Sequence, residues 1–121
     1  MRILNRLIVV GVLLFSIIAT GAFSKADENV NAAVEKVTIT IKNFEFSPAE
    51  VTVAPGTIVE WVNQGGKHTV EADNKSFKSP ELTAGQKYEF KFTKPGTYAY
   101  HCGFHGEAGG GGMSGKIIVK R

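Results

Sequence analysis

The sequence has a single cysteine, and among its 121 residues there are only two methionines, three histidines and one tryptophan. One cysteine cannot form a disulfide within the chain. In an exported protein such a residue is a link to a second chain, a reactive thiol or a metal ligand, and a buried inert thiol is the remaining alternative. His101 and His105 stand close to Cys102 in the sequence. This neighbourhood favours the metal ligand.

An excess of charge of either sign is also missing once the first residues are set aside. Three of the 14 lysines and arginines, Arg2, Arg6 and Lys25, precede Asp27, which is the first of the 11 acidic residues. From Asp27 onward there are therefore 11 basic and 11 acidic residues. Recognition of nucleic acid needs a concentrated basic face, and no such cluster occurs. We therefore expect no nucleic-acid partner.

Residues 1–26 have the layout of a secretory signal peptide. Two arginines near the start precede residues 7–24, an uncharged stretch of 18 residues rich in Leu, Ile and Val, and small residues at Ala22 and Ala26 offer cleavage sites. A retained membrane anchor is the alternative, because a span needs roughly 20 apolar residues. We favour cleavage, which predicts export to the periplasm or an equivalent extracytoplasmic space. Contact with a membrane would then require the uncleaved segment.

Helical periodicity is absent after the leader. Residues 27–36 are short and polar and are predicted to form a linker. The rest alternates between apolar and polar residues in short runs, separated by turn signals such as residues 54–56 (Ala-Pro-Gly). The expected strands are residues 37–42, 51–53, 57–63, 69–70, 88–92, 98–102 and 116–120, with Phe44 and Phe46 continuing the apolar set of the first. About seven to eight strands predict an all-β sandwich over residues 37–121, with Trp61 and Phe77 in its core.

The scarce residue types gather near the end of the chain. Cys102 and His105 are separated by two residues on a predicted loop, so that a sulfur and a ring nitrogen can converge on one point. Met113 follows after a run of glycines, residues 109–112. His68 lies on a separate loop, and loops at one end of a sandwich cluster together. A thiolate, two imidazoles and a thioether suit copper better than other common metals, with the thioether on the axis of the site.

As a group, these motifs resemble the cupredoxins of the plastocyanin and amicyanin kind over residues 37–121. The motifs are Trp-Val-Asn at residues 61–63 ahead of His-Thr-Val at 68–70, Pro-Gly-Thr-Tyr at 95–98 leading to Tyr-His-Cys-Gly-Phe-His at 100–105, and Met-Ser-Gly-Lys at 113–116. The resemblance implies an eight-stranded Greek-key sandwich with one type 1 copper, which carries single electrons between redox proteins. By position, His68, Cys102 and His105 resemble the three strong ligands and Met113 resembles the weak axial ligand.

The resemblance also implies roles for the residues around the ligands. The backbone N–H of Thr69 is expected to bond the cysteine sulfur and tune the potential, and Asn63 is expected to tie the two ligand loops together. His105 would be the exit for the electron, on a monomer that meets transient redox partners. Its apolar rim suits a small, weak docking face and consists of Gly103, Phe104 and Gly106.

The sequence departs from typical plastocyanins in three respects. Residues 105–113 form a longer stretch, so a backbone carbonyl near Lys67, or no axial ligand, is the alternative to Met113, which would then be a core methionine. His101 stands where plastocyanins usually carry an exposed tyrosine. Strand alternation places His101 on the face opposite Cys102, and we expect it to be exposed. There is no acidic cluster, so a photosynthetic partner is not implied.

Three classes of function remain, and electron transfer leads them. A periplasmic copper store or carrier on the same fold is the alternative, favoured if Met113 does not bind. An enzyme would need an open coordination position and further His or carboxylate ligands. Glu60 faces away from its apolar neighbours, Glu107 lies on a loop without a partner, and Ser114 has no histidine in a recognisable arrangement. We therefore expect no catalytic activity.

Overall fold

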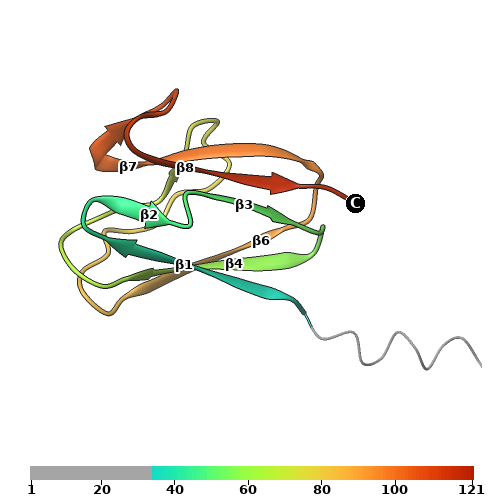
Figure 1. Cartoon of the computed structure of the whole chain (residues 1–121), viewed down its shortest axis with the longest axis horizontal. Helices are drawn as coiled ribbons and strands as arrows, with labels where there is room; N and C mark the ends of the chain where they lie inside the picture. The colour runs from blue at the N-terminus through green and yellow to red at the C-terminus, as the bar shows by residue number, and fades with distance from the viewer. Residues whose placement is uncertain (1–33) are drawn as a thin grey trace, which may run out of the picture. The chain divides into compact units, whose positions relative to one another are not determined.

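The structure is a computed structural model that describes residues 34–121 (Figure 1). The predicted signal peptide and residues 27–33 of the predicted linker lie outside the described residues. Within residues 34–121 the chain forms strands and turns, and no helix there is long and apolar enough to cross a membrane. The strands are β1 (Lys36–Lys42), β2 (Glu45–Ser47), β3 (Glu50–Val53), β4 (Thr57–Asn63), β5 (Glu71–Ala72), β6 (Lys87–Phe92), β7 (Gly96–Glu107) and β8 (Gly111–Val119).

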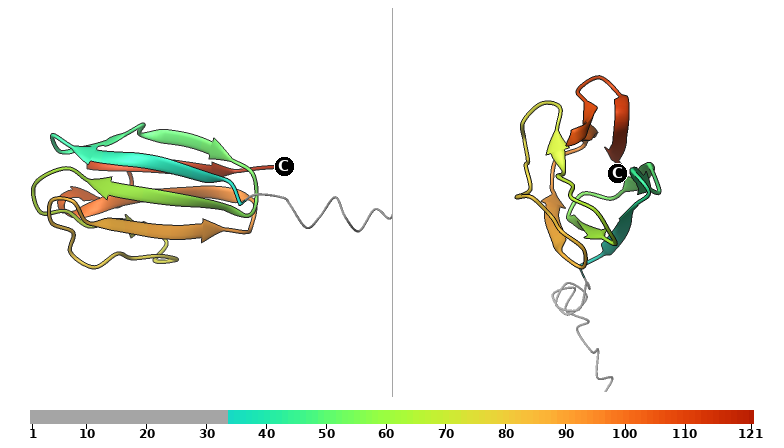
Figure 2. Two further views of the ribbon diagram at one scale, coloured as in Figure 1. Left: turned by 90° about the horizontal axis from the view of Figure 1, so that it is seen from below. Right: turned by 90° about the vertical axis from the view of Figure 1, so that its left-hand side faces the viewer.

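The strands build two four-stranded sheets, which pack face to face (Figures 1 and 2). One sheet has the order β2-β1-β4-β6 and the other has the order β3-β8-β7-β5. The pairs β1–β4 and β3–β8 are parallel, and the other pairs are antiparallel. Parallel partners that are not consecutive require the chain to pass between the sheets, as it does in Greek-key sandwiches. The predicted fold class is confirmed.

The core between the sheets is centred on Trp61 of β4. Its side chain is 0% exposed, and its ring centroid lies 5.4 Å from that of Tyr100 on the opposite sheet. Phe77 and Tyr88 each approach the Trp61 ring at 5.8 Å. Burial of one large apolar side chain contributes roughly 3 kcal/mol to folding. Trp61 and Phe77 are core residues, as predicted.

The segment after Cys102 differs from its prediction as a loop. Strand β7 continues to Glu107 and pairs with the start of β8, Gly106 with Gly112 and Glu107 with Gly111, beyond an irregularity in register that begins at His101. The glycine run makes this pairing possible, because a Cβ at Gly112 would clash with the backbone of His105. The run is therefore part of a β-hairpin, in which the two backbones pass close to each other.

Phe44 was predicted to continue the buried apolar set of β1, and this prediction is wrong. Phe46 is buried with 3% of its surface exposed, whereas Phe44 is 64% exposed. The reason is the turn between β1 and β2, in which Asn43 and Phe44 both have positive φ angles of 54° and 59°. This conformation reverses the chain in two residues and breaks the alternation that the sequence suggested.

Candidate metal centre

Three side chains predicted as metal ligands converge in the structure. The Sγ atom of Cys102 lies 3.7 Å from Nδ1 of His68 and 3.6 Å from Nδ1 of His105. The donor atoms of the three residues all lie within 4.8 Å of one another. His68 and Cys102 are buried, with 2% and 0% of their surface exposed, and His105 is exposed.

This spacing fits a single metal ion. Bonds of about 2.0–2.3 Å from imidazole nitrogen and thiolate sulfur to one ion separate the donors by roughly 3.6 Å when the angle between them is near that of a triangle or tetrahedron. A set of one thiolate and two imidazoles that leaves room for a weak axial ligand is the donor set of blue copper. The donors of this chain therefore fit a type 1 copper ion.

The backbone around His68 holds this ligand in place. His68 and Leu82 exchange two backbone hydrogen bonds, from His68 N to Leu82 O at 3.0 Å and from Leu82 N to His68 O at 2.8 Å. Burial lowers the pKa of His68, and the neighbouring His105 lowers it further, while a hydrogen bond with the backbone of Gly65 acts in the opposite direction. Near neutral pH the imidazole is therefore uncharged, which is the form that binds a metal.

Thr69 links the two ligand-bearing segments. Its backbone N–H points at Cys102 Sγ with a distance of 3.4 Å, as the resemblance implied. Its hydroxyl accepts a hydrogen bond from Gly103 N at 2.7 Å and donates one to Glu71 Oε2 at 2.8 Å. The residue after His68 is thus bonded both to the cysteine sulfur and to the residue that follows the cysteine.

Asn63 has a different role from the one predicted, because its bonds do not reach the Cys102 segment. Its side-chain amide donates to the carbonyls of Gly66 and Leu82, each at 2.9 Å, and its Oδ1 accepts from Gly65 N at 3.0 Å. Asn63 is fully buried at the end of β4. It therefore shapes the loop that carries His68, and Thr69 makes the link that was expected of Asn63.

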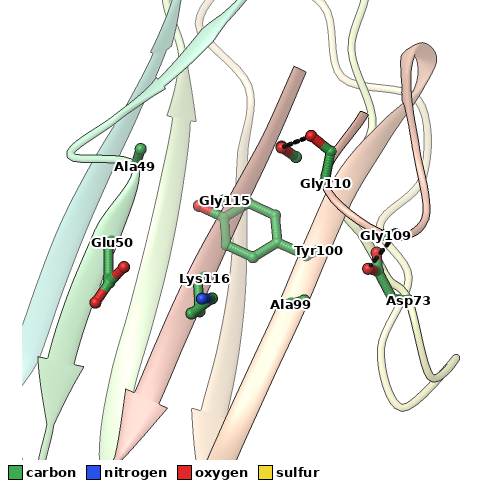
Figure 3. A pocket seen from close by; sticks show the side chains of 10 residues that line it. Ala49, Glu50, Asp73, Ala99, Tyr100, Gly109, Gly110, Gly115 and Lys116 are labelled. Atoms are coloured by element: carbon green, nitrogen blue, oxygen red, sulfur yellow. Dashed lines mark hydrogen bonds between the residues drawn. The ribbon is translucent and has the colours of Figure 1, made fainter. Parts of the chain in front are cut away.

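The prediction of an exposed His101 is wrong. Its side chain is 17% exposed, and its Nδ1 lies 2.7 Å from Asp73 Oδ1. Strand alternation does turn this ring away from Cys102, but β5 pairs with β7 at this point, Glu71 opposite His101, and the chain that follows β5 covers it. The second carboxylate oxygen of Asp73 accepts a hydrogen bond from Gly109 N at 2.9 Å (Figure 3). Asp73 therefore connects two points of the β7–β8 hairpin, His101 near its base and Gly109 at its tip.

Met113 lies in β8 as a buried residue with 4% of its surface exposed, and it belongs to the hydrophobic core cluster. It shares a surface hollow with Phe44 and Phe46. Its place as the axial ligand remains a prediction.

Phe44 lies at the centre, although the sequence did not predict it there. Its ring centroid lies 4.9 Å from that of His105 and 6.0 Å from that of His68, edge-on in both cases. Phe104, which was predicted to lie on the rim, is 53% exposed, and its ring centroid is 6.2 Å from that of His105. The place of Phe44 could have been predicted from the sequence only if residues 43 and 44 had been recognised as a two-residue turn between two strands.

A two-sheet sandwich with a His-Cys-His centre, two members of which lie in the β7–β8 hairpin, is the architecture of a blue-copper domain. The sequence model of the cupredoxin-like domain family matches residues 8–119. The chain belongs to this family.

Relatives of two kinds share the domain. Plastocyanin from Tetradesmus obliquus is 34% identical in an alignment of 115 positions that covers 85% of this chain and 77% of the relative. Amicyanin from Paracoccus versutus is 29% identical in an alignment of 127 positions that covers 93% of this chain and 92% of the relative. The crystal structure of that amicyanin matches with a TM-score of 0.60 over 75% of this chain and 87% of its own. The predicted resemblance is confirmed.

The same fold also occurs within a larger enzyme. A copper-containing nitrite reductase from Thermus scotoductus matches with a TM-score of 0.62 and 30% identity, over 71% of this chain and 22% of that chain. This chain therefore spans about a fifth of the reductase, and the likeness concerns one domain of it.

Proposed function

We propose that the protein carries single electrons by means of one type 1 copper ion held by His68, Cys102 and His105, with Met113 as the axial ligand. The observation that carries the proposal is the convergence of two Nδ1 atoms on one thiol sulfur, at 3.7 and 3.6 Å. The family, with its plastocyanin and amicyanin members, supports it.

When bound, copper supplies the exchange between Cu(I) and Cu(II). The protein's part is to keep the donors where they are in both states. His68 is fixed by paired bonds to Leu82, and the Cys102 segment is fixed through Thr69. Because these bonds hold the loop after β4 both to the Leu82 segment and to β7, the donors move little when the charge changes. A small rearrangement favours fast transfer.

The exposed ring of His105 is the proposed exit for the electron. It lies between the exposed rings of Phe44 and Phe104, so a partner meets an apolar surface around a single polar edge. A small apolar face suits a short-lived complex with another redox protein. We propose that the protein acts as a monomer outside the cytoplasm, without nucleic acid and without catalysis of its own. The layout of residues 1–26 supports export.

The visible and EPR spectra after addition of one equivalent of Cu(II) test the function. We expect an intense blue thiolate band and a narrow copper hyperfine splitting, both lost in Cys102→Ser. His101→Gln is the matched control, because His101 is adjacent to the cysteine but binds Asp73, and it should remain blue. A pale wild-type protein with ordinary tetragonal copper parameters would contradict electron transfer and favour copper storage.

A further inference from the structure

The turn that carries Phe44 has an unusual residue for its conformation. Lys42 pairs with Glu45, so Asn43 and Phe44 form a two-residue hairpin connection in which both φ angles are positive. Turns of this kind favour asparagine followed by glycine. A positive φ is unfavourable for a bulky side chain. The turn would be satisfied better by glycine at position 44.

Burial in the core does not explain why a phenylalanine stands at position 44 either. Phe44 is 64% exposed, whereas Phe46 two residues later is buried against Tyr100, with ring centroids 4.7 Å apart. Within residues 34–121, the aromatic rings that lie against Phe44 are those of His105 and His68. Residues in unfavourable backbone conformations cluster at functional sites, where the surrounding structure holds them. The strain at Phe44 therefore indicates a role at the metal centre.

The position of the ring relative to solvent indicates that purpose. Phe44 lines two surface hollows, one that reaches His68 beside Gln64 and Gly65, and one that reaches Met113 beside Gly112. His68 and Met113 are themselves buried. The phenyl ring therefore lies between the two hollows, beside the buried side chains of His68 and Met113.

We propose that Phe44 is a positioning residue of the metal centre: it fixes the rings of His105 and His68 edge-on and covers the centre from solvent. The part that concerns copper rests on the proposed function, whereas the ring contacts do not. His105 needs this support most, because it is exposed. The strained turn holds the phenyl ring against it.

Three variants of the full chain test the proposal. Phe44→Gly removes both the ring and the strain, Asn43→Gly relaxes the neighbouring positive φ and keeps the ring, and Phe44→Tyr restores an aromatic edge. We expect both glycine variants to unfold, without metal, at a temperature no lower than the wild type. We expect Phe44→Gly alone to lose copper to a Cu(I) chelator roughly 3- to 10-fold faster and to shift in reduction potential. Phe44→Tyr should behave like the wild type.

The opposite results would overturn the proposal. A marked fall in the unfolding temperature of Phe44→Gly would show an ordinary packing residue, and unchanged copper loss and potential would show that the ring does not support the centre. If the wild type forms no blue centre, the proposed function fails instead. In that case, the metal-free protein tests the positioning role. NOEs between the ring protons of Phe44 and His105 would support this role, and their absence would reject it.

Discussion

At the scale of single residues, the Cys102 sulfur has the most specific surroundings. It is fully buried, faces two imidazole nitrogens and accepts a hydrogen bond from the amide of Thr69. A hydrogen bond to a thiolate withdraws part of its charge, and the bonding and apolarity around the sulfur tune the potential of a copper site. The potential of this protein is therefore set by the backbone of the residue after His68 as well as by the ligands.

Met113 is the residue whose role can be tested most directly. If its thioether is the axial ligand, Met113→Leu removes a weak donor and leaves the three strong ones. We expect the variant to remain blue and to have a higher reduction potential, because the lost donor stabilised Cu(II) more than Cu(I). Voltammetry of both proteins measures the difference. An unchanged potential would show that Met113 is a core residue and that the axial position belongs to a carbonyl near Lys67 or to no ligand.

At the scale of elements, the β7–β8 hairpin carries Cys102, His105 and Met113. Gly112 has a φ of 63°, and a Cβ there would clash with the backbone of His105 and approach that of Gly106 at 3.2 Å. Gly112→Ala should therefore lower the free energy of unfolding by about 1–3 kcal/mol and broaden the copper EPR signal. Chemical denaturation of the metal-free protein and EPR of the copper form measure the two effects.

Gly111 offers a matched control one residue away. A Cβ there meets the side chain of Glu107 at 3.5 Å, an ordinary contact, and its φ is not positive. Gly111→Ala should change stability by less than about 0.5 kcal/mol. Equal effects of the two alanines would mean that the hairpin yields to a side chain at either position, and the close approach of its backbones would not matter.

Asp73 fastens the same hairpin to the body of the domain, and its contribution depends on pH. Burial acts to raise its pKa, but the hydrogen bonds from Gly109 and His101 outweigh burial, and the pKa lies below its ordinary value. A lowered folded-state pKa adds stability above the unfolded-state pKa of about 3.9, and this stability is lost as the pH falls through the folded-state pKa. Asp73→Asn should cost about 1 kcal/mol at pH 7.

Urea unfolding of the wild type and of Asp73→Asn at pH 7, 5 and 3 measures this contribution. The difference between the two proteins should be full at pH 7 and 5. It should shrink at pH 3, because this pH lies below the unfolded-state pKa and the unfolded carboxyl group then binds a proton that the folded one resists. Other carboxyl groups titrate in both proteins and cancel in the comparison. A difference that is the same at pH 3 as at pH 7 would show that the charge of Asp73 does not contribute.

The strands and the ligands were predictable from sequence to different degrees. The β-branched and aromatic residues in 57–63 predicted β4 with its bounds, and the types and spacing of Cys102, His105 and His68 predicted their convergence. The hairpin after Cys102 was missed because glycine has no alternation to read. The burial of His101 and the exposure of Phe44 depend on tertiary contacts and on two positive φ angles, which local pattern does not encode.

At the scale of the whole molecule, the described domain is two sheets joined by one core, and the metal centre draws on both. β4 belongs to one sheet and leads into the loop that holds His68. Cys102 and His105 lie in β7 of the other sheet. The relative position of the donors therefore depends on the packing of the sheets around Trp61. Any change that loosens this packing is expected to widen the centre before the protein unfolds.

The outer face of the first sheet carries an ion-pair cluster that ties β1 to β4 and β6. Glu60 and Glu89 stand directly opposite each other on β4 and β6, and Lys36 at the start of β1 lies 2.8 Å from one and 2.6 Å from the other. Like charges in opposite positions of a sheet are unfavourable. The hydrogen bond from Lys36 is the largest cause of the lowered Glu60 pKa. Lys36 therefore offsets the repulsion between the carboxylates of Glu60 and Glu89.

Removal of this lysine should act on the whole domain in a manner that depends on pH. We expect Lys36→Ala to lower the melting temperature at pH 7, because two facing carboxylates lose their shared partner. The lowered pKa of Glu60 means that the pair contributes above the unfolded-state pKa of about 4.3 and loses its contribution as the pH falls through the folded-state value. The deficit of the variant should therefore decrease as the pH falls below about 4, as differential scanning calorimetry can show. Lys87→Ala is the matched control, since Lys87 lies 3.8 Å from Glu60 and its loss should have a smaller effect at pH 7. If the deficit of Lys36→Ala is as large at pH 3 as at pH 7, the alkyl chain of Lys36, rather than its charge, stabilises the start of β1.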